Sequence, residues 1–408
     1  SINHYGLDLP EKMISIQSAL TFLFTLKFAL DFLSPFRDLN FVIFNTFVLL
    51  LFISQKYILQ SIHKRHALLL GAYLFFCFIW LSSSGNVEHF FKFASLAIIF
   101  FVVRASAMHL DCNAIPLLSQ RIFLIFIALA SANFLISTEL ADPANREFFN
   151  FEHANLLGSY LLTSLPFLYI SLLQERALTL RKTIISLLTL LSTSTGAFIC
   201  SLLAFVNIKK LSLRFIVLNV IFSLIAAVTS YFYLRHFSPE MFAKIFGPLH
   251  LLLGGGGSDL VHAARQKLPI QVLGDEYQGS MLWRLYAYIV FIDFIIEQPY
   301  WSLFFGNGFL GFLEIWDGIA PHNDFLLILI DFGLLAFLAL LYFLVRSFSW
   351  CLRRDIFMTP LILIMTLRLL TENNIYSYYI LSNFLIISIV FFQAKEKLNK
   401  DHESTNHN

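Results

Sequence analysis

Apolar runs long enough to cross a lipid bilayer recur along this chain, and they restrict its fold more than any other feature. A helix of about 20 apolar residues spans the hydrocarbon core of a membrane. Charged residues make up 13% of the 408 residues, whereas a soluble domain carries roughly 25%. Backbone polar groups in lipid must be hydrogen-bonded within the protein, which makes a helix the natural form for such runs. The sequence therefore predicts an all-α fold, a polytopic bundle of transmembrane helices.

Ten runs are apolar enough to be interpreted as full spans. They lie near residues 13–33, 40–54, 67–84, 89–103, 121–137, 155–173, 213–234, 322–345, 357–371 and 376–393.

An eleventh apolar segment, 183–207, lies between two basic clusters, so both of its ends should be cytoplasmic. Two full spans would need about 40 residues, which is more than this segment has. Two short helices that turn at Ser192–Gly196 solve the problem, because glycine and small hydroxyl residues suit a tight turn. The alternative is one tilted helix with a basic cluster on the wrong side. With the pair of half-spans, about twelve spans are expected.

Lys and Arg residues set the orientation, because short cytoplasmic loops are enriched in both. Placing every basic cluster in the cytoplasm gives a consistent path with both termini inside. Segment 235–321 then forms a large loop on the outer side and contains an interfacial helix near 282–298. We expect one transmembrane domain over 1–394, without a cleavable signal peptide, and a disordered cytoplasmic tail over 395–408.

His322 is the first candidate for chemistry, because it lies where the outer loop meets a long apolar run. Histidine is the side chain best suited to exchange a proton near neutral pH. Asn323 follows it, and Asp324 would lie in the first turn of the helix, where a carboxylate is favourable. A histidine that only caps the helix is the alternative interpretation.

Several arginines could bind an anionic substrate at the outer surface. Arg284 is the strongest candidate, because a guanidinium matches phosphate oxygens with two hydrogen bonds. An interfacial arginine whose charge simply reaches water is the alternative. Arg265 and Arg146 lie on the two outer loops, and a solvated position explains each of them as well.

Charges within the spans suggest either ion pairs or a polar cavity. Arg368 and Glu372 are one helical turn apart, so an ion pair within the helix is the simple interpretation. Because charges in a span usually face the interior of the bundle, the pair could also border a substrate cavity. Lys27 and Asp31 repeat the spacing, and there we expect only an ion pair.

Several classes of function are excluded or disfavoured. The sequence shows no motif for metal ligands or for nucleotide phosphates, so we expect metal-independent chemistry and no cofactor. The net charge of +2 is too small to suggest a nucleic-acid partner.

The order of the polar residues resembles that of the O-antigen polymerase and O-antigen ligase superfamily (Wzy-like and WaaL-like proteins). The most specific similarity is His322–Leu326 followed by Gly333–Phe337, which is similar to the family's His-Asn and Gly-Leu-x-Gly pattern, with Ala336 in place of the last glycine. Further elements resemble the family over about residues 150–390: Asn155, Trp283–Arg284, Pro299, Gly306–Phe309 and Thr371–Asn373.

The chain departs from the family pattern at the turn of the short hairpin. The family often has Ser-Arg-Gly there, and this chain has Ser194, Thr195 and Gly196. The ligases depend on that arginine, so its absence favours a polymerase. Another cation would then have to bind the substrate diphosphate; the candidates are Arg368, Arg146 and Arg265.

The resemblance implies a membrane-embedded glycosyltransferase of the bacterial inner membrane, with its active site facing the periplasm. The donor would be a glycan on undecaprenyl diphosphate, and the acceptor a sugar hydroxyl on a second lipid-linked repeat unit. His322 would be the catalytic base and Arg284 the diphosphate clamp. Asn155, Asn323, Arg368 and Glu372 would contact substrate, and a chain-length regulator could be a partner.

Two alternatives remain open. The first is an O-antigen ligase, which would transfer the glycan to lipid A-core. The second is a flippase for lipid-linked glycans. A transporter should show internal repeats and charges along a central path, whereas the polar residues of this chain gather at one membrane face. This distribution favours an enzyme.

Overall fold

The regular elements of the computed structural model are all helices, and no strand occurs among the residues that it describes. Those residues are 16–33, 37–54, 64–108, 115–140, 151, 154–170, 175–206, isolated positions between 221 and 254, and 257–268, 280–316, 320–354 and 359–405. The all-α prediction is confirmed for this part of the chain.

The chain divides into two compact units, and each is described separately. The first comprises Ser1–Leu70, Ala94–Thr193 and Tyr378–Asn408, and the second comprises Gly71–Phe93 and Ser194–Ser377. Two of the boundaries fall within helices, α4 (Lys64–Ser84) and α5 (Val87–Met108), and the other two follow Thr193 and Ser377. The single domain expected over 1–394 stays a prediction.

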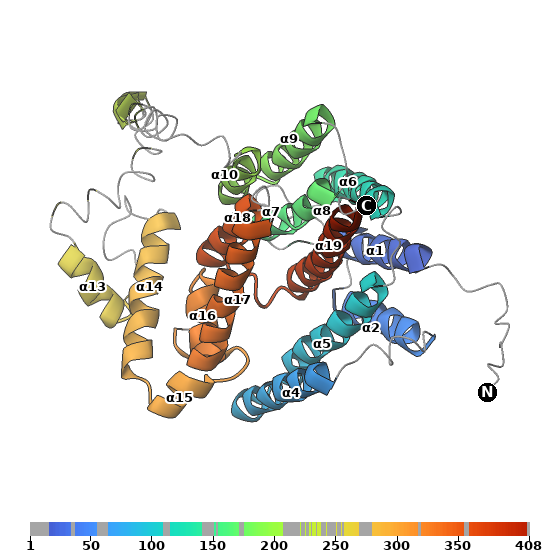
Figure 1. Cartoon of the computed structure of the whole chain (residues 1–408). Coiled ribbons are helices and arrows are strands. Elements are labelled where there is room, and N and C mark those ends of the chain that lie inside the picture. The colour runs from blue at the N-terminus through green and yellow to red at the C-terminus, as the bar shows by residue number, and fades with distance from the viewer. Residues whose placement is uncertain are drawn as a thin grey trace, which may run out of the picture. The chain divides into compact units, whose positions relative to one another are not determined.

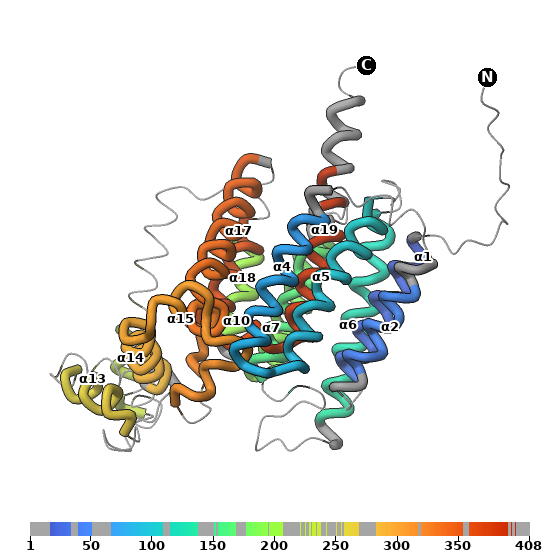
Figure 2. Tube along the Cα trace, turned by 90° about the horizontal axis from the view of Figure 1, so that it is seen from below, coloured from blue at the N-terminus to red at the C-terminus, as the bar shows by residue number. Residues whose placement is uncertain are grey.

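The first unit is a bundle packed around α1. Beside the second part of α5 it contains α1 (Ile16–Leu33), α2 (Arg37–Ser54), α6 (Ile115–Leu140), α7 (Ala154–Leu162), α8 (Leu165–Ile170), α9 (Glu175–Leu191) and α19 (Tyr378–Thr405). Helix α1 contacts both α2 and α6 and lies between them in Figure 1; Figure 2 shows the same three helices from below. Buried aromatic rings fill this contact: Phe28 meets Phe126 edge to face, with 5.0 Å between ring centroids.

The charged pair of α1 lies inside this bundle. Lys27 and Asp31 form the ion pair that their spacing predicted, and both are almost fully buried. The hydroxyl of Tyr160 donates to Asp31 at 2.6 Å, and the Lys27 ammonium donates to the carbonyl of Tyr379 at 3.3 Å. The pair therefore connects α1 with α7 and α19, as expected for charges that must avoid lipid.

The second unit surrounds a short helix, α16 (Asp324–Asp331). Around it lie α10 (Thr195–Leu202), η1 (Leu203–Phe205), α13 (Gly257–Arg265), α14 (Ser280–Glu297), α15 (Tyr300–Phe305), η5 (Gly311–Glu314), α17 (Gly333–Arg354) and α18 (Thr359–Thr371). Helix α16 contacts α14, α17 and α18, and α13 packs along α14 (Figure 1). Leu327 and Ile330 of α16 belong to the apolar core that joins these elements.

Four helical segments among the described residues are long and apolar enough to cross a membrane. They are Ala67–Ser84, Val87–Met108, Ile115–Ser137 and Gly333–Arg353. The first three coincide with predicted spans, and the fourth overlaps the second half of the predicted span 322–345. These segments are consistent with a transmembrane protein. The count of twelve, the large outer loop and the orientation of the termini stay predictions, and most of the expected span 213–234 lies outside the described residues.

Two expected spans are broken rather than continuous. The run 155–173 divides into α7 and α8 at Thr163 and Ser164, whose hydroxyls donate to carbonyls three residues earlier, at 2.6 and 2.7 Å. Pro166 stands in the first turn of α8. Proline cannot donate a backbone hydrogen bond and clashes with the preceding turn, so its favoured place in a helix is the first turn.

The expected span 322–345 divides at Phe332 into α16 and α17, because another chain segment crosses there. The backbone N–H groups of Asn307 and Gly308 donate to the carbonyls of Ile330 and Asp331, both at 2.9 Å. Gly333 has φ +82°, a conformation that side chains with a Cβ rarely adopt. A Cβ at Gly333 would also overlap the carbonyl oxygen of Phe304.

The turn expected at Ser192–Gly196 is present. Helix α9 ends at Leu191 and α10 begins at Thr195, with Thr193 in the left-handed region at φ 58°. The side chain of Ser194 accepts from the N–H of Ala197 at 3.3 Å and so caps α10. This turn is also the boundary between the two units, so the pairing of the two half-spans stays a prediction.

Candidate functional site

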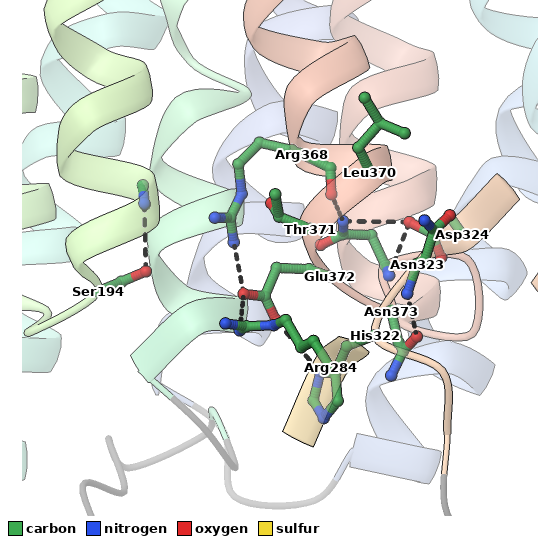
Figure 3. A network of polar contacts seen from close by, with 12 residues as sticks. Ser194, Arg284, His322, Asn323, Asp324, Arg368, Leu370, Thr371, Glu372 and Asn373 are labelled. Carbon is green, nitrogen blue, oxygen red and sulfur yellow. Dashed lines mark hydrogen bonds and ion pairs between the residues drawn. The ribbon is translucent and has the colours of Figure 1, made fainter. Parts of the chain in front are cut away.

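Four ionisable side chains from three separate segments converge in the second unit. Glu372 lies in the middle: its Oε1 accepts from Arg284 Nη2 at 3.3 Å and is 4.0 Å from Arg368 Nη2. Its Oε2 is 3.7 Å from His322 Nδ1. Figure 3 shows these side chains pointing toward one another. The structure therefore brings together both expected catalytic residues and two of the expected substrate-binding residues.

The end of α18 explains why Glu372 lies there. Helix α18 ends at Thr371, and the N–H of Glu372 donates to the carbonyl of Arg368 at 3.1 Å, which continues the helical turn. Arg368 and Glu372 are therefore on the same side of α18, as their spacing of four predicts. Both are almost fully buried, at 2% and 5% exposure. Arg284, on α14, is partly exposed and reaches the pair from the outside.

His322 is held in an unusual backbone conformation. Its φ is 49°, in the left-handed region that is uncommon for residues other than glycine. The following residues are fastened to the segment after α18. The N–H of Asn323 donates to Asn373 Oδ1 at 3.2 Å, and the carboxylate of Asp324 accepts from the N–H groups of Asn374 and Ile375, both at 2.9 Å.

Asn323 has a structural position rather than one facing the cluster. Its side-chain oxygen accepts from the N–H groups of Phe325 and Leu326, at 2.9 and 3.2 Å. This is the N-cap of α16, which satisfies two otherwise unpaired donors of the helix. The side-chain oxygen of Asn323, a residue expected to contact substrate, is therefore engaged within the protein.

An aromatic wall supports the histidine ring. Trp283 meets His322 edge to face with 5.0 Å between centroids, and Trp316 stacks on Trp283 with 6.0 Å between centroids. Because Trp283 precedes Arg284 on α14, one helix supplies both the wall and a guanidinium.

The second guanidinium lies beside the start of α10. Arg368 Nη1 is 3.1 Å from the position that a Cβ would occupy at Gly196. This places a cation at the 194–196 turn, where the superfamily often has an arginine. Arg368, one of the cations expected to replace that arginine, therefore lies at the turn.

Of the remaining expected residues, only Arg265 lies in the part of the second unit that the structure describes. Arg265 pairs with Asp293 at 3.0 Å, and its side chain is 66% exposed. Asn155 lies in α7, in the first unit. Arg146 lies outside the described residues.

Sequence reasoning missed the residues that fix the cluster. Asn373 and Asn374 fasten the His322 segment, and Trp283 supports the ring. The sequence did contain a signal for these residues, because the motif Thr371–Asn373 and the pair Trp283–Arg284 were both recognised. Each motif was interpreted residue by residue, and a contact between the two segments was not predicted.

Two guanidinium groups can bind an anion. The imidazole close to them can remove a proton from a group next to that anion. The described residues include no group of three or more His, Cys, Asp and Glu side chains that could hold a metal ion. The sequence matches no protein-family model, and no curated protein matches it either. The resemblance to the O-antigen superfamily thus depends on the motifs alone.

Proposed function

We propose that this protein is a membrane-embedded glycosyltransferase of the O-antigen polymerase type. It would transfer a glycan from undecaprenyl diphosphate to a sugar hydroxyl of another lipid-linked repeat unit. The observation that supports this most strongly is the convergence of Arg284, Arg368 and His322 around Glu372. Its site would face the periplasm of the bacterial inner membrane, with a chain-length regulator as a possible partner.

The reaction needs two functions that this cluster can supply. Diphosphate leaves readily when its charge is neutralised, and Arg284 is the partly exposed guanidinium that could bind it with two hydrogen bonds. The acceptor hydroxyl must lose a proton as it attacks the sugar, and His322 is a suitable base. The donor is already activated, so neither a nucleotide nor a metal is required.

The function is tested by deleting the gene and analysing the surface glycan on a gel. Lipid A-core that carries single repeat units would support a polymerase. Bare core would indicate a ligase, and repeat units that accumulate on the cytoplasmic side would indicate a flippase. Either of the last two results would refute the proposal.

The site is tested by complementing the deletion with His322→Gln. Glutamine keeps the size and hydrogen bonding of the side chain but cannot accept the proton, so polymer should be lost while the protein inserts normally. General-base catalysis contributes about 10²–10⁴-fold to rate, so a loss of that size is expected. Polymerisation at the wild-type rate would exclude His322 as the base.

A further inference from the structure

The two nitrogens of His322 have different surroundings. Nδ1 is buried, has no hydrogen-bond partner among the described residues, and lies 3.7 Å from Glu372 Oε2. The side chain as a whole is 36% exposed. Figure 3 shows the other ring nitrogen, Nε2, pointing away from Glu372. A carboxylate thus faces one nitrogen, and the other is directed elsewhere.

The two oxygens of Glu372 have different neighbours as well. Oε1 faces the guanidinium groups of Arg284 and Arg368, and Oε2 faces His322. Because Glu372 is only 5% exposed and cations surround it, a sugar hydroxyl could reach it only with difficulty. Glu372 is therefore poorly placed to be the base itself.

Independent contacts hold the ring in this orientation. The left-handed backbone at His322 costs free energy and persists only when neighbouring contacts enforce it. The segment after α18 provides those contacts through Asn373, and Trp283 supports the ring from α14. The segment that positions the histidine is thus the one that carries Glu372.

We propose that Glu372 is a positioning residue that keeps the proton of neutral His322 on Nδ1, so that Nε2 is the nitrogen that receives the proton of the acceptor. The proposal rests on the transferase function above. A carboxylate that faces one imidazole nitrogen selects the tautomer protonated there and stabilises the imidazolium that forms. The separation of 3.7 Å is longer than a hydrogen bond, and catalytic contacts often shorten only when substrate binds.

The acceptor oxygen forms a bond to the anomeric carbon of the donor, and its proton moves to Nε2 of His322. The bond between that carbon and the diphosphate oxygen breaks, and its electron pair leaves with the diphosphate beside Arg284. The imidazolium then stands next to Glu372 and returns its proton to water before the next transfer.

The tautomer can be measured without any assay of activity. Protein labelled with ¹⁵N-histidine is reconstituted in lipid, and the His322 signals are identified by their loss in His322→Gln. At a pH where the ring is neutral, wild-type protein should carry its proton on Nδ1. Glu372→Gln should weaken this preference, whereas Glu372→Asp, which keeps the charge, should retain part of it.

Kinetics provide the second measurement. Removing the carboxylate that holds a catalytic histidine in one tautomer can cost as much as about 10⁴-fold in kcat. Glu372→Gln should therefore lower kcat by about 10-fold or more, up to that factor, with little change in KM. The matched control is Glu88→Gln: Glu88 also pairs with a cation, Lys92, but its side chain is 60% exposed, on α5. This control should leave both kcat and the tautomer unchanged.

Two results would overturn the proposal. One is a wild-type His322 with its proton on Nε2, which can be seen even if Glu372→Gln does not fold. The other is a folded Glu372→Gln protein whose tautomer and kcat equal those of the wild type. A wild-type protein with the expected tautomer but no glycan transfer would uphold the positioning and refute the proposed function.

Discussion

Arg284 and Arg368 approach the same carboxylate oxygen but differ in their access to solvent. Arg368 is almost fully buried, whereas the side chain of Arg284 is 28% exposed. A buried guanidinium that helps to hold Glu372 can shape the site, and a partly exposed one can also reach a ligand. Arg284 is therefore the residue at which an effect on substrate can best be separated from an effect on folding.

Substitution of Arg284 should lower transfer while the protein still inserts. A hydrogen bond to a charged group contributes about 1.5–3 kcal/mol, which corresponds to about 10–100-fold in rate. Arg284→Ala should lose activity by that factor. Arg284→Lys should recover only part of it, because an ammonium cannot form the paired hydrogen bonds of a guanidinium. Transfer is measured with purified protein and lipid-linked donor.

The insertion control for this experiment is the amount of protein in the membrane fraction, which should match the wild type for both variants. Full activity of Arg284→Ala at equal protein levels would remove Arg284 from the site.

At this scale the sequence identified the members of the cluster but not their contacts. His322, Arg284, Arg368 and Glu372 stand out because charged groups are rare in an apolar chain. Only the contact between Arg368 and Glu372 follows from local spacing. Arg284 meets Glu372 across 88 positions of the chain, and no periodicity predicts such a contact.

At the scale of secondary structure, the 304–308 segment crosses the chain at the junction of α16 and α17. This crossing fixes where α16, the helix that follows His322, ends. Gly306 and Gly333 both have φ +82°, and a Cβ at Gly306 would overlap the carbonyl oxygen of Asp331. Asp331 strengthens the junction, since its Oδ1 accepts from the N–H of Phe312 at 2.9 Å. The crossing therefore leaves room only for glycine at both positions.

Gly306→Ala and Gly333→Ala should each lower the thermal stability of the protein in detergent. A left-handed conformation costs a residue with a Cβ roughly 1–2 kcal/mol, and the steric overlap adds to this. The measurement is the apparent Tm, followed by intrinsic fluorescence.

Gly71→Ala is the matched control for these two variants. Gly71 lies within α4, and a Cβ there would meet nothing within 4 Å. Alanine is favoured over glycine in a helix by about 1 kcal/mol, so the Tm should stay the same or rise slightly. Gly333→Ala protein as stable as Gly71→Ala would show that the crossing does not constrain the backbone.

Hydropathy predicted the positions of these elements but not their interruptions. The apolar run continues through Phe332 and through Thr163, so a sliding average detects no break at either residue. Gly333 and Pro166 were visible signals, but both residues are also tolerated in continuous transmembrane helices. The break at Ser192–Ser194 was predicted because too few residues were available for two full spans.

At the scale of the whole molecule, the orientation in the membrane decides whether the cluster can meet a lipid-linked donor at the periplasmic face. The basic clusters predict both termini in the cytoplasm and the loop 235–321 outside. The apolar helices do not determine this orientation, because an apolar helix can cross a membrane in either direction. Orientation must therefore be measured with labels on opposite sides.

Such labelling requires that the native cysteines contribute no background signal. Cys77, Cys200 and Cys351 are buried, and Cys112 lies outside the described residues. With all four replaced by serine, single cysteines can be introduced at positions that differ only in their expected side of the membrane.

Cysteines at Thr138 and Gly256 should react with a membrane-impermeant thiol reagent added to spheroplasts, whereas cysteines at Arg181 and Lys209 should react only after permeabilisation. The physical reason is that the basic clusters around Arg181 and Lys209 resist translocation, so the segment between them must enter and leave the membrane on the same side. Two short helices with a turn at 192–194 meet this requirement. Labelling from outside at Lys209 but not at Arg181 would mean a single tilted span and would refute the paired half-spans. Labelling from outside at both would reverse the orientation and move the candidate site away from its proposed substrate.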